Sequence, residues 1–159
     1  MNLLDLTMDQ LRKYILELHS YCNQAERMNG NVSEVNVSWH IQHCLLVIHK
    51  SIQALLLSKP EDYKSEFNLP RIILFYLKWF PRGKGKAPDR VKTQTTNNID
   101  FQPLFDKAEI HIQKLEQALS KQYMPHPIFG KLDKQQTITM LTLHTLHHIR
   151  IIKDIVKDG

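Results

Sequence analysis

The chain has 159 residues, of which 42% are hydrophobic, 23% are charged and only five are glycine, and its formal net charge is +5. These values exclude a disordered or collagen-like protein and fit a single globular helical domain, which we expect to span residues 1–159. With two cysteines, an acid at position 5 where a leader would be basic, and no apolar run long enough to cross a bilayer, we expect a cytoplasmic protein with no membrane partner.

Apolar residues recur at helical spacing in four long segments. These segments run from about Thr7 to Arg27, from Asn36–Ser38 to about Ser58, from about Phe101 to Gln122, and from Asp133 to about Lys157. Thr7 and Asp133 are suitable N-caps, and Gln136 stands at the capping-box position after Asp133. No segment shows the alternation of a half-buried strand, so the sequence predicts helices alone.

The second and third long helices are separated by a connection over residues 59–100, which is too long for a tight antiparallel turn. Within this connection, we expect a shorter helix over residues 69–80 and an extended polar loop over residues 83–98. The expected fold is therefore all-α: a four-helix bundle with a long crossover between the second and third long helices.

Much of the positive charge lies in one basic segment from Arg71 to Lys92. Its members are Arg71, Lys78, Arg82, Lys84, Lys86, Arg90 and Lys92, against the single acid Asp89. Two interpretations are open: a solvated loop, favoured by its prolines and glycines, or a lip that binds an anionic substrate or partner. No nucleic-acid motif accompanies these residues, so we expect no nucleic-acid partner.

The last helix carries imidazoles in its apolar stripe. His144 and His148 are four residues apart, so both rings project from one face and can hold one divalent ion. The alternative is a half-buried face whose histidines are satisfied by hydrogen bonds or water. His147 is rotated by about 100° from His148 and should face sideways, towards a neighbouring helix or a dimer partner.

A third ligand should come from another helix. His43 fits best, because Trp39 lies one turn before it and Leu46 and Val47 one turn after it on the same apolar side. The sequence therefore predicts a metal site of His43, His144 and His148. We expect His40 and His49 at surface or boundary positions, and His19, His111 and His126 have no comparable pairing. His111 could reach the cavity, although a boundary position with satisfied hydrogen bonds is favoured. Cys44 should serve packing alone.

Three segments resemble the DinB/YfiT-like metalloenzymes: Val37 to Cys44, Met140 to His148, and His126 to Leu132. The last of these resembles a branch recorded as a domain of unknown function. The resemblance implies a four-helix bundle with the crossover after its second helix, and a divalent metal, usually nickel or zinc, on His43, His144 and His148. It also implies a homodimer. Characterised relatives use low-molecular-weight thiols, although the Gly-Gln that often follows the last histidine motif in them is absent here.

Three neutral imidazoles leave at least one coordination position open, as in catalytic zinc sites, and a metal there can lower the pKa of a bound water or thiol. We therefore expect a divalent-metal-dependent enzyme, a thiol-dependent S-transferase or a hydrolase, acting on a small-molecule substrate. No separate general base or other catalytic residue is apparent. The alternative is a non-catalytic helical module that binds metal or a ligand and contacts an anionic partner through the basic segment.

Overall fold

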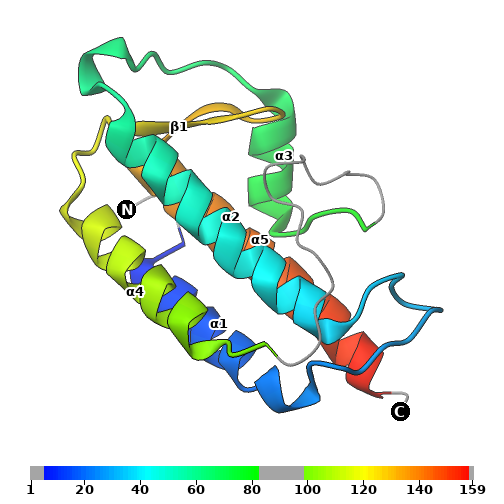
Figure 1. The fold of residues 1–159 in the computed structure, drawn as a ribbon. Coiled ribbons are helices and arrows are strands. Elements are labelled where there is room, and N and C mark those ends of the chain that lie inside the picture. The colour runs from blue at the N-terminus through cyan, green and yellow to red at the C-terminus, as the bar shows by residue number, and fades with distance from the viewer. Residues whose placement is uncertain (1–5, 83–98, 158–159) are drawn as a thin grey trace.

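The computed structural model describes residues 6–82 and 99–157 (Figure 1). Over these residues the chain forms α1 (Met8–His19), α2 (Val37–Leu57), α3 (Leu69–Leu77), α4 (Gln102–Gln117), β1 (Tyr123–His126), β2 (Gly130–Asp133) and α5 (Lys134–Lys157). Short 3-10 turns lie at Cys22–Gln24 and Pro60–Asp62. Within this described part, no helix is both long and apolar enough to cross a membrane.

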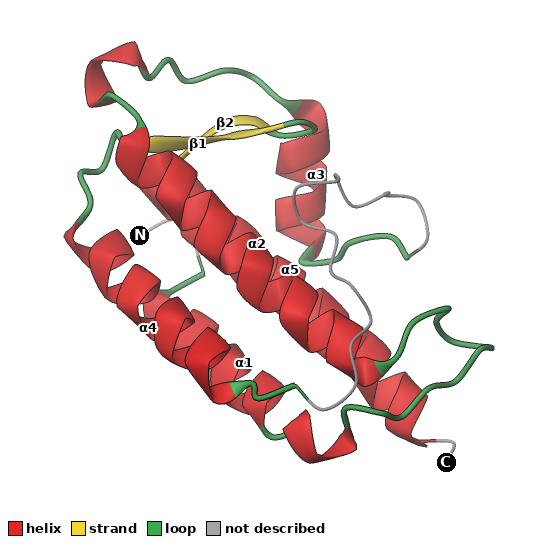
Figure 2. Ribbon diagram, in the orientation of Figure 1, coloured by secondary structure: helices red, strands yellow, loops and turns green. Residues whose placement is uncertain are grey.

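The prediction of an all-α four-helix bundle is wrong. The described residues contain five α-helices and a two-stranded antiparallel sheet, which Figure 2 shows as a hairpin crossing one end of α2 and α5. The two strands have four residues each and pair with Met124 opposite Leu132 and His126 opposite Gly130. Strands this short, one of them interrupted by a proline, give no readable alternation in sequence. Met124 and Leu132 are buried, so the hairpin adds to the core.

The turn of the hairpin depends on a glycine and a histidine. Gly130 has a φ of +71°, a backbone conformation that residues other than glycine rarely adopt, and a Cβ there would lie 3.2 Å from Glu66 Oε2. His126 Nδ1 accepts hydrogen bonds from the backbone N–H groups of Ile128 and Phe129, both at 3.2 Å. Residues 126–130, with the sequence His-Pro-Ile-Phe-Gly, therefore form a tight turn.

Helices α2 and α5 run side by side through the middle of the molecule, with α4 and α1 on one side and α3 on the other (Figure 1). Their facing apolar residues are fully buried, among them Ile41, Ile48, Leu141 and Ile152. The expected capping box of α5 is confirmed, because Asp133 Oδ1 accepts from Gln136 N at 2.8 Å while Gln136 Oε1 accepts from Asp133 N at 3.2 Å. This helix pair positions the histidines described below.

Two of the four long predicted helices are shorter than expected. Helix α1 ends at His19 rather than near Arg27, because the chain continues through bonds of the i→i−3 kind at Tyr21, Gln24 and Ala25. The returning segment is held to the start of α2 by Ser38 N, which donates to Ala25 O at 2.8 Å. The loop after α1 therefore folds over the first turns of α2. The second shorter helix is α4, which ends at Gln117 rather than near Gln122.

Helix α3 confirms the short helix expected over residues 69–80, although it ends at Leu77, and Arg71 ties it to the hairpin. Arg71 is 7% exposed, and its guanidinium donates to the backbone carbonyls of Phe129 at 3.2 Å, Lys131 at 3.4 Å and Glu66 at 2.6 Å. Arg71 is thus an internal structural residue. The expectation that it belongs to a solvated or anion-binding segment is wrong.

The other residues of the basic segment have different surroundings. Lys78 ends α3 in the left-handed conformation with φ 49°, and Arg82 pairs with Asp154 at 2.6 Å on the surface. The predicted polar loop at 83–98 lies outside the described residues, and so do Lys84, Lys86, Arg90 and Lys92.

Candidate metal centre

The structure brings the three predicted ligands together. His43 comes from α2, and His144 and His148 lie one turn apart on α5, where α2 packs against it. One ring nitrogen of each lies within 4.8 Å of the others. The ring centroids are 5.1 Å apart for His43 and His144, 4.9 Å for His43 and His148, and 4.6 Å for His144 and His148. This is a cluster that could hold a metal ion.

The surroundings of His144 and His148 keep both rings neutral. Burial lowers the pKa of both His144 and His148 well below the ordinary histidine value, and the neighbouring histidines lower it further. Neutral imidazole is the form that donates a lone pair to a metal. Among the described residues, His144 Nδ1 has no hydrogen-bond partner although it is buried. An unpartnered buried nitrogen costs free energy, and the donor set therefore fits a bound cation.

A fourth histidine, His40, contacts His148 outside the cluster of three. It is only 3% exposed, its Nδ1 lies 2.9 Å from His148 Nδ1, and its Nε2 lies 3.0 Å from Ser33 Oγ. Burial lowers the pKa of His40 to about 4. The expectation of a surface or boundary position for His40 is wrong, because the loop after α1 folds over this turn of α2 and supplies Ser33.

The contacts of His40 allow a set of hydrogen bonds that leaves His148 free to bind a metal. Two Nδ1 atoms at 2.9 Å require one donor and one acceptor. If His148 Nδ1 carries the proton, its Nε2 lone pair is available to a metal, and His40 accepts at Nδ1 and donates its Nε2–H to Ser33 Oγ. Ser33 Oγ also accepts from Val35 N at 3.3 Å. Metal-binding histidines commonly donate their second ring N–H to such an outer partner, which fixes tautomer and orientation.

Trp39 and His147 flank the cluster without joining it. The Trp39 ring stacks on His43 with a centroid distance of 4.8 Å and an interplanar angle of 9°. His147 lies edge-on to His148 at 5.2 Å and 6.2 Å from the ring of Phe80, on the chain just after α3. The sideways orientation expected for His147 therefore brings it to that segment.

Comparison with known families matches residues 1–154 to a family described as a protein of unknown function, DUF1569. The chain belongs to the DUF1569 family. No curated protein and no solved structure matches this DUF1569 chain. The match confirms a family of unknown function and carries no activity with it, and membership of the DinB/YfiT-like metalloenzymes stays a prediction.

A second histidine pair in this DUF1569 protein connects α2 to α4. His49 Nδ1 lies 3.0 Å from His111 Nε2, and His111 Nδ1 lies 2.8 Å from the carbonyl of Lys107. The sequence patterns gave no sign of this pairing, because each histidine stands alone on its own helix. Since the Lys107 carbonyl can only accept, His111 Nδ1 carries a proton, and the pair is satisfied as a structural contact.

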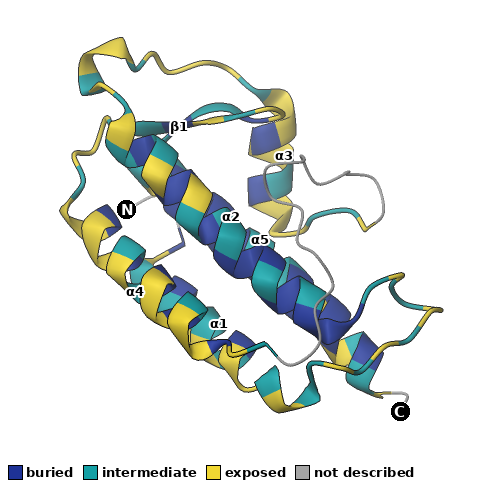
Figure 3. Ribbon diagram, viewed as in Figure 1, coloured by how far each residue is buried: buried dark blue, intermediate teal, exposed yellow. Residues whose placement is uncertain are grey.

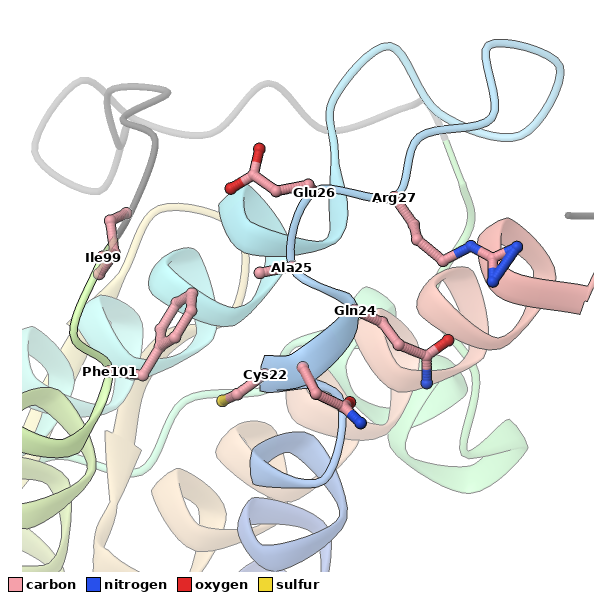
Figure 4. A pocket seen from close by; sticks show the side chains of 8 residues that line it. Cys22, Gln24, Ala25, Glu26, Arg27, Ile99 and Phe101 are labelled. Atoms are coloured by element: carbon pink, nitrogen blue, oxygen red, sulfur yellow. The ribbon is translucent and has the colours of Figure 1, made fainter.

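The two cysteines of the DUF1569 chain are not suited to nucleophilic chemistry. Cys44 is fully buried, and burial raises the pKa of its thiol far above the ordinary value, so the packing role predicted for it agrees with its position. Burial also raises the pKa of Cys22 to about 11. Cys22 lines a separate pocket of about 300 Å³ formed by residues 22–27, Ile99 and Phe101 (Figure 4). None of the clustered histidines lines that pocket.

Proposed function

We propose that this DUF1569 protein is a divalent-metal-dependent enzyme whose ion is held by His43, His144 and His148. The supporting observation is the convergence of three imidazoles, two of them kept neutral by burial, with ring nitrogens within 4.8 Å of one another. Within the described part of the chain, the cluster includes no fourth ligand, and His40 is engaged by His148 and Ser33. Structural zinc sites close their shell with four protein ligands, whereas catalytic sites leave a position open.

Nickel or zinc suits such a set of nitrogen ligands. When bound, either ion would lower the pKa of a coordinated water or thiol and so supply a nucleophile near neutral pH. Side chains of the protein surround the ligands and hold them in place. Trp39 covers one face of His43, and His40 holds the ring of His148.

For the reaction we propose transfer to a low-molecular-weight thiol ahead of hydrolysis, with a small molecule as substrate and a cytoplasmic setting. The thiol follows from the resemblance to the DinB/YfiT-like enzymes. A nucleic-acid partner has little support from the described basic residues, since Arg71 is internal and Arg82 pairs with Asp154.

The test begins with protein purified without a polyhistidine tag, because a tag would bind metal itself. Elemental analysis should find one nickel or zinc ion per chain, and the loaded protein should then be screened with thiol cosubstrates and with hydrolysable esters and amides. His144→Ala is the matched control for every activity found. Metal binding without turnover in any of these assays would favour a non-catalytic metal-binding module instead.

His40 should act as a positioning residue for this centre. We expect His40→Ala to weaken metal affinity about 10–100-fold, the usual cost of losing an outer-shell partner of a ligand. His40→Asn should recover most of the affinity, because its side-chain oxygen can accept at the position of Nδ1. His49→Ala removes another histidine of α2 and should leave the affinity unchanged. Chelator competition with Zn²⁺ measures all three, and equal affinities for His40→Ala and His49→Ala would refute the role.

The pH dependence of metal binding should follow the lowered pKa of the ligands. Because burial keeps His144 and His148 neutral below the ordinary histidine pKa of about 6.5, protons compete with the ion only under more acidic conditions. The affinity should be nearly constant from about pH 8 to 6.5 and fall at lower pH. Competition titrations at stepped pH measure this, and a steep loss between about pH 8 and 7 would indicate ligands of higher pKa than these imidazoles.

A further inference from the structure

The loop between α1 and α2 contains an Asn-Gly step at Asn29 and Gly30. Elsewhere in the sequence no asparagine is followed by glycine. Gly30 is exposed, and a Cβ built on it would meet no atom of the described chain within 4 Å. Figure 3 shows the loop projecting from the start of α2, with intermediate and exposed positions along it. Water therefore reaches this step, and there is space around it for the backbone to react.

The side chain of Asn29 is folded back along its own backbone. Its Oδ1 accepts a hydrogen bond from Asn31 N at 3.1 Å, which forms an Asx turn. Such a turn holds the side-chain amide carbon beside the backbone nitrogen of the residue between them, Gly30. In the described part of the chain, no group accepts a hydrogen bond from Gly30 N. The bond to Oδ1 also withdraws electron density from Asn29 Cγ, which is therefore placed and polarised for attack by Gly30 N.

We propose that Asn29 is a site of spontaneous deamidation. Gly30 N forms a bond to Asn29 Cγ, and the bond from Cγ to Nδ2 breaks. Ammonia leaves with the proton of the Gly30 N–H, and a cyclic succinimide remains. Water then opens the ring: attack at Cγ yields aspartate, and attack at the backbone carbonyl carbon yields isoaspartate, in which the main chain runs through Cγ. Each product carries a new carboxylate, and the reaction consumes only water.

The modified residue belongs to the turn that places Ser33. Asn29 O accepts from Val32 N and from Ser33 N, both at 2.9 Å. Ser33 Oγ in turn lies 3.0 Å from His40 Nε2. Isoaspartate lengthens the main chain by one carbon within this turn and converts the carbonyl of Asn29 into a free carboxylate, so Ser33 loses its fixed position beside His40. Deamidation then weakens the outer support of His148, a consequence that rests on the proposed metal centre, whereas the reaction at Asn29 does not.

The experiment is incubation of the full-length protein at neutral and at mildly alkaline pH, followed by mass spectrometry of the tryptic peptide 28–50. Asn29 should become heavier by the difference between a hydroxyl and an amino group. The conversion should be faster at the higher pH, because the attacking nitrogen must lose its proton. Asn31 is the internal control, since it is exposed in the same loop and present in the same peptide but precedes Val32, whose branched side chain obstructs the attack.

Gly30→Ala should slow the conversion at least about 10-fold, because a Cβ crowds the approach of the nitrogen and restricts the backbone. A synthetic peptide with the sequence of residues 26–34 gives the rate in an unfolded chain. The folded protein should convert at a comparable rate, because the Asx turn already holds the two reacting atoms together. Asn29 that stays intact in the folded protein while the peptide converts would overturn the inference, and so would equal conversion of Asn31.

Zn²⁺ affinity, measured by chelator competition, separates this inference from the proposed function. Protein rich in isoaspartate should bind Zn²⁺ about 10-fold more weakly than fresh protein, at the lower end of the cost of losing an outer-shell partner. Asn29→Asp adds the new charge without lengthening the chain and should bind like wild type. Unchanged affinity after full conversion would refute the link from Asn29 to His40. Fresh protein that binds no Zn²⁺ would refute the metal centre instead, and the conversion seen by mass spectrometry would stand.

Discussion

Replacing His148 with alanine is expected to lower metal affinity by more than about 100-fold, since losing even an outer-shell partner of a ligand costs 10–100-fold. The substitution removes one of the three clustered ligand nitrogens and also leaves His40 Nδ1 without the ring it faces at 2.9 Å. His43→Ala and His144→Ala should have comparable effects. Competition with a chromophoric chelator and elemental analysis of the purified variants both measure the loss.

The matched control is the neighbouring residue His147. It is also partly buried and on α5, but its ring lies towards Phe80 and outside the cluster of ligand nitrogens. His147→Ala should therefore keep full metal occupancy. Normal metal content in His148→Ala, or equal loss in both variants, would contradict the assignment of the ligands.

Helical phase alone brought the three clustered histidines into one prediction. Four residues of separation on one helix fixes the relative placement of His144 and His148, and the apolar neighbours of His43 turn it towards the same core. His40 could not be found in that way. Its burial depends on Ser33 and on the irregular loop after α1, and no sequence periodicity predicts the course of that loop. The pair of His49 and His111 was missed for a related reason, because it joins two helices that each carry one histidine.

Local sequence patterns likewise predicted only part of the fold. The long amphipathic helices and the cap at Asp133 follow from local patterns, and the structure contains them. The hairpin was missed because its strands are too short to alternate, and its turn depends on Gly130 and on hydrogen bonds to His126. Without the hairpin, the sequence predicts helices alone and offers Arg71 no backbone carbonyls to bind. The error in fold class and the error about Arg71 therefore have one cause.

Arg71→Ala should destabilise the protein by about 2–4 kcal/mol. The guanidinium donates to three backbone carbonyls, and its removal leaves buried acceptors unpaired at the contact between α3 and the hairpin. Chemical denaturation of the metal-free protein measures the change without a contribution from bound metal. Metal content should remain normal at low temperature, because none of the clustered ligands contacts Arg71 through these bonds.

The control is Arg82→Ala, which removes another arginine of the basic segment. Arg82 pairs with Asp154 on the surface, with side chains 46% and 48% exposed, and such pairs contribute about 0–1 kcal/mol because water and salt screen them. Arg82→Ala should therefore leave the free energy of unfolding almost unchanged. Equal and small effects of both substitutions would mean that the Arg71 carbonyl contacts are replaced by water at little cost, and that the hairpin does not depend on them.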